Sequence, residues 1–340
     1  MPWKVNWQVF IDGRDMSSVM APFLMDIDVT DKDGTSSDTC SLRFDDAGGQ
    51  VLLPPDGAKV RVLLQGVQVF FGTVDTVRSS GSRGRGMVLQ VSAKGMDSRG
   101  RIKEPQAFHK DDASLEEFLQ TAAERAGLAG VRVLGRLGAI RRGYWAADGE
   151  SFLHLGQRLA RELAATFKIR ATDAGDMAVL APREHDEPLP VVEGVVGRNV
   201  ISWDIAPYTG RRVFTSARAR WFDRESATFR EREVTFALDR DLPESVNVLR
   251  STVHDEDQAE EAGAARKAEA EREGGEGSVE LDLVPEAQAE GSFVLTGARP
   301  AVDGTYRIAS VTHRASRNGG STTSLDIKRP QGGAGKDDRG

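Results

Sequence analysis

The sequence has few of the residues that build disulfide frameworks, metal centres and membrane spans. Of its 340 residues one is cysteine, Cys40, so neither an intramolecular disulfide nor a multi-cysteine zinc site can form. The five histidines are scattered, and none has a second histidine or cysteine at the short spacing of a zinc site. No stretch approaches the roughly 20 apolar residues that a membrane-spanning helix requires. We therefore expect no metal, no cofactor and no membrane segment.

An excess of basic residues is also missing. Acidic residues outnumber basic ones by 52 to 45, which gives a formal net charge of −7. A protein whose task is to grip phosphate backbones needs a basic surface, so tight nucleic-acid binding is disfavoured. Residues 1–10 alternate polar and apolar types and lack the continuous apolar core of a signal peptide, which predicts folding in the cytoplasm. With 39% hydrophobic and 29% charged residues, the composition is that of a water-soluble globular protein.

The first third of the chain has the pattern of an all-β domain. Short runs in residues 3–97 alternate apolar and polar side chains between glycine, aspartate and serine clusters, which is typical of a meandering sheet or barrel. Residues 60–64 and 67–71 alternate on either side of Gln65-Gly66, which predicts a hairpin. Residues 79–86, rich in glycine, serine and arginine, are interpreted as a mobile loop. The first domain is placed at residues 1–105.

The period changes in the middle of the chain. Ser114 followed by Glu117 predicts a capping box and a helix that begins at Leu115 and ends at Gly127. Apolar residues at helical spacing predict a second helix over residues 150–167. Three short strands are expected at residues 131–134, 167–171 and 177–180. These elements predict a small α/β domain at residues 106–190.

The last third returns to β patterning, and a second β domain is placed at residues 191–330. Residues 255–273 are rich in Ala, Glu, Lys and Arg, which favours an exposed helix inserted into this domain. The tail at residues 331–340 is expected to be disordered. Strands are expected at residues 200–205, 212–222, 233–236, 278–283, 291–295, 306–313 and 322–327.

The predicted fold class is therefore mainly β with an α+β insertion: two β domains flank a small α/β domain. This arrangement raises the question of duplication, because a repeated fold need not keep visible sequence identity. Inspection of the residues finds no convincing repeat in the sequence itself.

Catalytic chemistry has little support. Glu150, Glu162, Asp173 and Asp176 could supply a carboxylate pair for glycoside hydrolysis, but sequence proximity does not establish the separation that this reaction needs. There is no Gly-x-Ser-x-Gly elbow, and Cys40 in a predicted strand is interpreted as an ordinary buried thiol. We expect no catalytic residue and no enzyme activity, with a cell-wall hydrolase as the alternative.

Four arginines are candidate inter-subunit contacts. Arg83 and Arg85 lie in the glycine-rich segment 79–86, where a single arginine-glycine run without aromatic residues is a weak signal for nucleic acid. Arg218 and Arg220 share one face of a predicted strand whose other face carries Ala217, Ala219 and Trp221. Arginine suits ion pairs at interfaces, and a solvated surface is the competing interpretation for both pairs.

Four blocks of sequence, taken in order along the chain, carry a family resemblance. The blocks are Tyr144-Trp145-Ala146-Ala147-Asp148-Gly149-Glu150-Ser151-Phe152-Leu153 with Leu159-Ala160-Arg161-Glu162, the strand FTSARARWFD at residues 214–223, the alanine-rich helix at 259–270, and Gly297-Ala298-Arg299-Pro300 with residues 302–306 and Val311-Thr312-His313. They resemble the corresponding blocks of the phage late control gene D proteins. The resemblance departs from the usual pattern at Ala147, where glutamine is common, and at Phe222, where tyrosine is common. Neither change removes a known chemical role.

The resemblance implies a structural baseplate hub of a contractile phage tail, similar to the base of type VI secretion spikes. Such a hub is a homotrimer in which each subunit supplies two tube-protein-like β-barrel domains. Six similar barrels match a six-fold tail tube, and the trimer matches a trimeric central spike. The expected function is thus symmetry adaptation between tube and spike, without catalysis.

The resemblance also implies partners and a location. The expected partners are a second and third copy of this chain, the tail tube protein, the central spike protein and other baseplate proteins. DNA is expected to pass through the lumen without specific binding, which an acidic balance favours because like charge suppresses adhesion. The expected location is the virion tail baseplate, after synthesis and assembly in the bacterial host cytoplasm. The alternatives are a tail-associated cell-wall hydrolase and the spike-base protein of a type VI-like secretion system.

Overall fold

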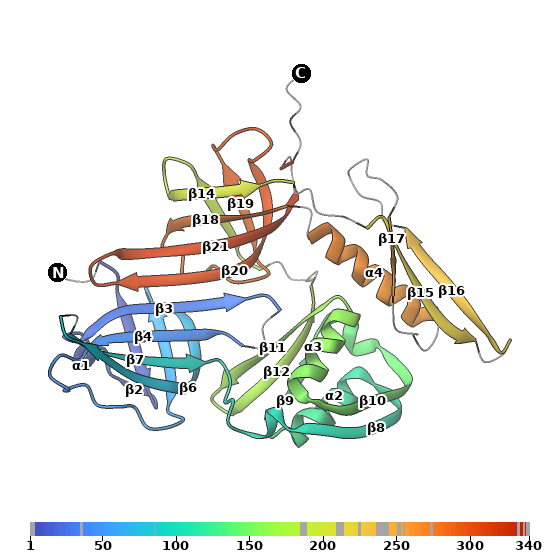
Figure 1. Ribbon diagram of the computed structural model, residues 1–340, viewed down its shortest axis with the longest axis horizontal. Coiled ribbons are helices and arrows are strands. Elements are labelled where there is room, and N and C mark those ends of the chain that lie inside the picture. The colour runs from blue at the N-terminus through green and yellow to red at the C-terminus, as the bar shows by residue number, and fades with distance from the viewer. Residues whose placement is uncertain are drawn as a thin grey trace.

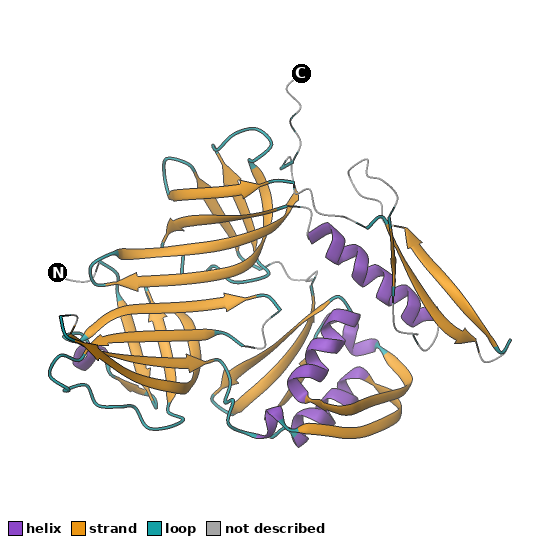
Figure 2. Ribbon diagram, viewed as in Figure 1, coloured by secondary structure: helices purple, strands orange, loops and turns teal. Residues whose placement is uncertain are grey.

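The computed structural model describes residues 4–34, 37–84, 86–183, 189–208, 214–223, 226–235, 245–249, 253, 256–272, 275–331, 334–335 and 337. Strands form most of the molecule, and helices are confined to a few places (Figure 2). Four groups of elements can be followed along the chain (Figure 1). We refer to them as the N-terminal β unit, the α/β unit, the C-terminal β unit and the outer sheet unit.

The N-terminal β unit is an antiparallel sheet with its own apolar core. Alternating side chains of its strands point inward, and Val9, Ile27, Val60 and Leu64 are fully buried. Positive φ angles at Gln65 and Gly66 make the tight turn between β5 and β6. The elements are β1 (Trp7–Ile11), β2 (Arg14–Asp15), α1 (Ser17–Met20), β3 (Leu24–Lys32), β4 (Thr39–Asp45), β5 (Lys59–Leu64), β6 (Val67–Ser82) and β7 (Gly86–Lys94).

The α/β unit packs two helices on short strands. Helix α2 begins at the predicted capping box: the Ser114 side chain accepts from the Glu117 N–H, and the Glu117 carboxylate accepts from the Ser114 N–H. Phe118 and Phe152, one from each helix, are fully buried in a shared core. The elements are η1 (Arg101–Lys103), β8 (Pro105–Ser114), α2 (Leu115–Arg125), β9 (Gly130–Val133), η2 (Gly135–Ala139), β10 (Arg141–Ser151), α3 (Phe152–Glu162), β11 (Ala165–Thr172) and β12 (Gly175–Pro182).

The C-terminal β unit continues the sheet of the N-terminal β unit. Strand β20 pairs with β3 in antiparallel register from Ser310 opposite Lys32 to Ser316 opposite Asp26. One sheet therefore runs through both units, in the order β14-β18-β21-β20-β3-β4-β7-β6-β5-β1-β2. The elements are β13 (Val191–Val195), β14 (Val200–Ala206), β18 (Glu276–Asp282), β19 (Ser292–Thr296), β20 (Gly304–Ser316) and β21 (Gly320–Gln331).

The outer sheet unit is a small three-stranded sheet with one helix on its inner face. It has its own core, in which Ala219 and Trp221 pack against Ala259 of the helix. In Figure 1 it lies at the opposite end of the molecule from the N-terminal β unit. The elements are β15 (Ser216–Asp223), β16 (Thr228–Thr235), β17 (Val246–Val248) and α4 (Glu256–Arg272).

A five-strand pattern occurs twice in the chain. The order β3-β4-β7-β6-β5 of the N-terminal β unit recurs as β14-β18-β21-β20-β19 in the C-terminal β unit. Every equivalent pair of neighbouring strands is antiparallel. The two units are joined through β3, the first strand of one pattern, and β20, the fourth strand of the other.

The register of the repeat agrees residue by residue. Both long hairpins carry a bulge six residues before the tip, between Val74 and Thr76 in β6 and between Ile308 and Ser310 in β20. Strands β3 and β14 carry a bulge at equivalent places as well. The two units are therefore a duplication that is visible in the pairing although the residues differ. Equivalent pairs are Ser82↔Gly86 and Ser316↔Gly320, Val77↔Val91 and Val311↔Leu325, Leu42↔Val91 and Val279↔Leu325, Ile27↔Leu42 and Trp203↔Val279.

Three expectations from the sequence are wrong in detail. Residues 79–82 are not a loop, because they continue β6 and pair with β7 as far as Ser82↔Gly86. The second helix ends at Glu162, and Phe167 lies in β11, where its ring packs on α3. The helix was also expected to begin at residue 150, but Glu150 and Ser151 end β10, which pairs with β8, and the helix begins at Phe152.

Some expectations concern residues outside the described ranges. These include Arg85, the two end residues of the helix predicted at 255–273, and most of the tail predicted to be disordered. Within that tail, Gln331 ends β21 and Ala334 is buried in the core of the C-terminal β unit.

Candidate assembly surfaces

The outer sheet unit presents the face that carries Arg218 and Arg220. Arg218 donates from Nε and an Nη to Glu233 across the sheet, at 3.2 and 2.8 Å. The hydrogen bond from the Ser216 hydroxyl lowers the pKa of Glu233, and the hydrogen bonds and positive charge of Arg218 lower it further. Arg220 lies over the Phe229 ring at 5.0 Å. The predicted two-faced strand is confirmed, since Ala217, Ala219 and Trp221 are buried on the other side.

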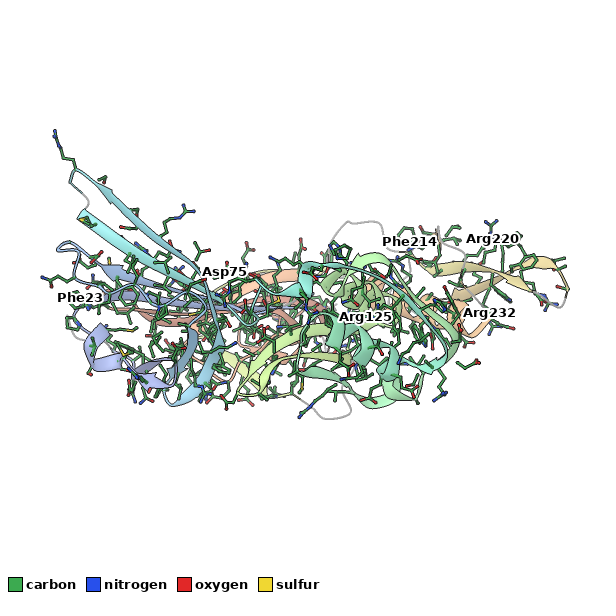
Figure 3. All side chains as sticks on the ribbon, turned by 90° about the horizontal axis from the view of Figure 1, so that it is seen from below. Phe23, Asp75, Arg125, Phe214, Arg220 and Arg232 are labelled. Carbon is green, nitrogen blue, oxygen red and sulfur yellow. The ribbon has the colours of Figure 1, made fainter. Side chains whose placement is uncertain are left out.

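Large apolar side chains are exposed on the same face. Phe222 and Phe229 meet edge to face at 5.3 Å, and they are 44% and 59% exposed. Val248 on β17, directly opposite Arg218, is 61% exposed. Phe214, Arg220 and Arg232 mark this end of the molecule in Figure 3. The face thus combines arginines with aromatic rings, a composition that is enriched at protein interfaces.

The hairpin of β6 and β7 is the second protruding feature. It projects from the body beyond Asp75, which lies at its base in Figure 3. Arg83 lies at its tip and is exposed, while Arg85 lies outside the described residues. Strand β5 pairs with β6 only as far as Thr73, so residues 76–82 have β7 on one side and no described strand on the other. Such an open edge can pair with another chain.

The free edge of β14 is a surface that the sequence did not reveal. β14 ends the sheet order, and apart from an isolated bridge between Val196 and Val200 no described strand pairs with its outer side. Ile201 and Trp203 on this strand are 51% and 41% exposed, and Tyr208 just beyond it is 65% exposed. The strand itself was predicted at residues 200–205, but exposure depends on which strands lie beside it, and the alternation of residues does not contain that information.

A buried ionic cluster joins the α/β unit to both β units. The Lys168 ammonium on β11 contacts Asp31 and lies 2.9 Å from Asp38. Burial alone raises the pKa of Asp31, but the charge and hydrogen bond of Lys168 and the N–H of Ala289 outweigh it and lower that pKa. Burial, and then the charge of Asp31, raise the pKa of Asp38. The ammonium group stands between the two carboxylates, where a hydrolase would need its water or substrate.

The four carboxylates considered for hydrolysis are engaged in ion pairs. Glu150 and Glu162 both contact Arg158, at 2.6 and 3.8 Å. Asp173 is exposed and pairs with Arg61 of the N-terminal β unit. Asp176 pairs with Lys59 and accepts from the Asp97 N–H. Glu162 contacts two further partners, Arg142 at 2.8 Å and Gln258 of α4. The contacts of Asp173 with Arg61, Asp176 with Lys59 and Glu162 with Gln258 join the α/β unit to its neighbours, which is a structural role.

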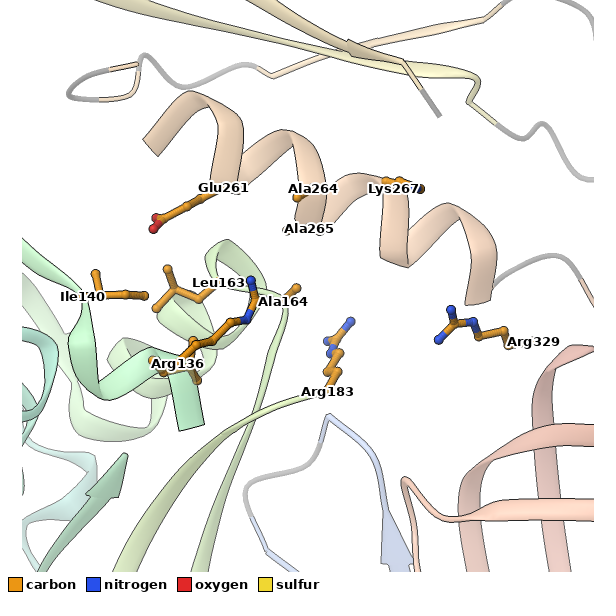
Figure 4. Close-up of a pocket in the computed structure, with 11 residues that line it drawn as sticks. Arg136, Ile140, Leu163, Ala164, Arg183, Glu261, Ala264, Ala265, Lys267 and Arg329 are labelled. Carbon is orange, nitrogen blue, oxygen red and sulfur yellow. The ribbon is translucent and has the colours of Figure 1, made fainter. Parts of the chain in front are cut away.

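A cavity of about 620 Å³ separates α4 from the α/β unit (Figure 4). Cationic side chains gather around it: Arg136, Arg183, Lys267 and Arg329. Glu261 is the one carboxylate among its described lining residues, and Arg142 pairs with it at 3.0 Å. A single, paired carboxylate does not provide the two acids of a glycosidase. The cavity therefore gives the hydrolase alternative no support.

The histidines and the cysteine occupy structural positions. His313 is buried in β20, where its ring contacts the Thr323 hydroxyl at 3.1 Å and the Ala287 carbonyl at 3.2 Å. The strand was expected to end at His313, but it continues to Ser316. His154 is exposed on α3, and Cys40 is buried in β4. Over the described ranges, no group of three or more His, Cys, Asp or Glu side chains could hold a metal ion. No helix in that part of the chain is long and apolar enough to cross a membrane.

Comparisons with known sequences find two curated relatives and no matching family model. The chain is 26% identical over 138 residues to the probable baseplate hub protein of Escherichia phage P2, which covers 38% of this chain and 36% of that protein. It is 24% identical over 232 residues to the probable baseplate hub protein of Escherichia phage 186, covering 66% and 58%. The matched region thus spans well under two thirds of each relative.

Solved structures match the chain over nearly its whole length. The 43 kDa tail protein of prophage MuSo2 from Shewanella oneidensis has a TM-score of 0.71 at 15% identity, covering 96% of this chain and 99% of that one. A tail protein from Neisseria meningitidis MC58 has a TM-score of 0.72 at 13% identity, covering 97% and 98%. This chain has the phage tail-protein fold.

The tail-protein fold extends to secretion machinery. The c3393 protein of E. coli, a component of the type VI secretion system, matches with a TM-score of 0.59 at 13% identity, covering 95% of this chain and 76% of that one. These matches confirm the resemblance to baseplate hubs and type VI spike bases that the four sequence blocks indicated. The mainly β architecture with large antiparallel sheets is confirmed as well.

Proposed function

We propose that this protein is a structural hub of a contractile phage tail or a related particle, which joins the six-fold tail tube to a trimeric central spike. The observation that carries the proposal is the agreement of two independent comparisons. The curated relatives are named as baseplate hub proteins, and the tail-protein fold covers 96% and 97% of this chain. The hub function is proposed for the whole protein because the relatives are matched over only part of their length.

The duplicated five-strand pattern supports symmetry adaptation. Each chain carries two units with the same strand order and register, and β3 and β20 join them side by side. We propose that the two units are tube-protein-like β-barrel domains, at residues 1–105 and 191–330, on either side of an α/β domain at 106–190. Three such chains would present six similar units to a six-fold tube and three-fold symmetry to a spike.

The absence of catalysis is part of the proposal. The relatives are named for structural roles, and the candidate acids Glu150 and Glu162 are held by Arg158 and Arg142. These ion pairs lie within the α/β unit, where each carboxylate contacts at least one arginine. A tail-associated hydrolase therefore has no structural observation in its favour.

The proposed partners are further copies of this chain, the tube protein, the spike protein and neighbouring baseplate proteins. DNA would pass through the lumen without specific binding, in keeping with the net charge of −7. Assembly would take place in the host cytoplasm, and the mature location would be the virion tail. Arg83, Arg85, Arg218 and Arg220 remain proposed inter-subunit contacts, since Arg83 is exposed at a hairpin tip and Arg220 lies on an exposed face.

The test is a gene deletion in the bacterium that produces the particles. Without the chain we expect no complete tails in electron micrographs, because tube growth lacks its starting ring. Expression of the wild-type chain from a plasmid should restore the tails, and the variant Glu150→Gln should restore them too if its stability permits folding. A deletion that leaves tails intact but abolishes cell-wall degradation would favour the hydrolase and contradict the hub.

A further inference from the structure

We propose that a second copy of this chain binds through strand addition: β14 of one copy pairs in antiparallel register with the outer edge of β6, residues 78–82, of the next. The inference rests on the proposed hub function, since it names the surface through which copies of the hub join. It follows from the duplication within the chain, which already contains one example of the contact.

The β3–β20 joint is that example. Within one chain the outer edge of β3, the first strand of the N-terminal pattern, pairs with β20 of the C-terminal pattern. Side chains support the pairing: Arg314 donates to Asp28 at 2.7 Å, and the hydroxyls of Thr30 and Thr312 lie 3.1 Å apart. Strand β20 pairs with β19 before its bulge and with β3 after it.

The counterparts of these two edges are both open. In the repeat, β14 is equivalent to β3, and β6 is equivalent to β20. Strand β6 pairs with β5 before its bulge, just as β20 pairs with β19 before its own bulge. After the bulge, the residues of β6 have no described strand on the side that faces β5. Strand β14 likewise has no described strand on the side where β3 pairs with β20, apart from the isolated bridge between Val196 and Val200. Each chain thus presents two complementary, unpaired edges.

The intrachain joint also supplies the register of the new contact. Transfer of the pairs Thr312↔Thr30 to Ser316↔Asp26 onto the equivalent positions places Arg78 opposite Ala206 and Ser82 opposite Ser202. The intervening pairs are Ser79↔Ile205, Ser80↔Asp204 and Gly81↔Trp203. The contact therefore joins five residues of each strand.

The residues at these positions fit one another. Trp203 is 41% exposed, and the position opposite it is Gly81, whose missing side chain leaves room for the indole ring on that face. Residues 78–82 are all exposed, and the strand edge consists of an arginine, three serines and a glycine. These residues are compatible with contact to water while the edge is unpaired. Asp204 occupies the place of Asp28, and Ser80 occupies the place of Arg314. The contact between copies would therefore keep the carboxylate of the intrachain ion pair and lack its arginine.

A second copy is favoured over an unrelated strand because the two edges are different and complementary. Pairing of β14 on one copy with β6 on the next leaves the same two edges free at the ends, so the contact is head-to-tail. A head-to-tail contact closes into a ring when its rotation permits. Since this joint would repeat the geometry of β3–β20, each unit around the ring would be related to the next by nearly the same rotation, as a six-fold tube requires.

Cysteine cross-linking between two differently substituted chains tests the register. One chain carries Ser80→Cys and the other Asp204→Cys, so a bond between the two positions can form only between copies. Directly opposite residues have Cβ atoms about 4.5–5.5 Å apart, which a disulfide can span. The matched control mixes Ser82→Cys with Ala206→Cys, whose positions would be about 13 Å apart along the strands. The native Cys40 is buried and serves as the unreactive background.

Charge variants at the same pair test the contact without cross-links. Ser80→Arg would reproduce the Arg314–Asp28 pair and should tighten association by up to about fivefold, measured by sedimentation equilibrium. Ser80→Asp places like charges opposite each other and should weaken it by a similar factor. The double variant Ser80→Asp with Asp204→Arg should restore association. Both positions are exposed, so folding is expected to be unaffected.

The outcomes separate this inference from the hub function. Efficient linking in the Ser80/Asp204 mixture with little in the control mixture supports the pairing. Equal linking in both mixtures, no linking at protein concentrations where the chains associate, or no association at any concentration overturns it. In each of those cases the deletion experiment still decides the hub function, because tails that fail to form without this chain would require a hub that joins through other surfaces.

Discussion

The Lys168 ammonium lies 2.9 Å from a carboxylate oxygen of Asp38, across the boundary between the α/β unit and the N-terminal β unit. The lysine side chain is only 8% exposed, and it also contacts Asp31. Asp31 in turn accepts from the Ala289 N–H of the C-terminal β unit. Three units therefore meet at one ammonium group, so the relative placement of the units depends on this cluster.

Removal of the cation should be strongly destabilising. In Lys168→Met, the partly buried carboxylates of Asp31 and Asp38 lose their counter-charge, which should cost up to about 3–5 kcal/mol in the free energy of unfolding. Chemical denaturation followed by tryptophan fluorescence measures the change. The matched control is Arg61→Ala, which removes the ion pair with the exposed Asp173 and should cost about 1 kcal/mol or less. A loss of equal size in the two variants would show that the cluster has no special role.

His313 predicts a loss of stability in mildly acidic solution. Burial lowers the pKa of its imidazole from 6.5, against smaller opposing contributions from the Ala287 carbonyl and nearby acids. The group is neutral in the folded state, so its contribution is present above pH 6.5 and is lost as pH falls toward the lower folded pKa. The slope contributed by one proton is at most about 1.4 kcal/mol per pH unit.

Two histidine variants isolate this effect. The free energy of unfolding is measured at several values between pH 7.5 and pH 5 for wild type, His313→Gln and His154→Gln. We expect His313→Gln to lose part of the acid-induced decline, whereas His154→Gln, at an exposed position, should follow the wild type. Parallel profiles for all three proteins would mean that His313 does not titrate differently on folding.

Gly156 predicts an intolerance to even one added carbon. A Cβ at this position of α3 would lie 2.3 Å from the Phe167 ring of β11, so the helix rests directly on the ring. Gly156→Ala should destabilise the protein by about 1–3 kcal/mol through overpacking. Gly100→Ala is the control, since a Cβ there meets nothing within 4 Å. The thermal midpoints of the two variants compare them directly, and a neutral Gly156→Ala would contradict the close helix–strand contact.

Local rules predicted most elements of this fold. The capping box at Ser114 and the alternation on either side of Gln65 are encoded within a few residues, and the structure has both. The helix predicted to reach Phe167 ends at Glu162, because Ala164 takes a positive φ that a helix does not permit. The prediction ran too far because the apolar spacing of a helix continues past this point. The arginine and glycine content of residues 79–86 is typical of loops, but it also suits an exposed strand edge.

The candidate assembly surfaces were only half predictable. The two-faced strand with Arg218 could be identified because alternation fixes which side chains share a face. The edge at Trp203 could not be identified from the sequence, because the position of a strand at the edge of a sheet depends on how strands distant in sequence are ordered. The duplication was invisible for the same reason: Ile27 and Trp203 are equivalent by pairing and bulge position, and the residues themselves differ.

As a hub, the chain would adapt three-fold to six-fold symmetry at the tip of a tail tube. The most direct measurement is cryo-electron microscopy of the tail tip in particles that carry a tagged copy of this chain. We expect one ring of three copies between tube and spike, with two similar β units of each chain around the lumen. A ring of six copies, or density for the tag anywhere other than the junction of tube and spike, would contradict it.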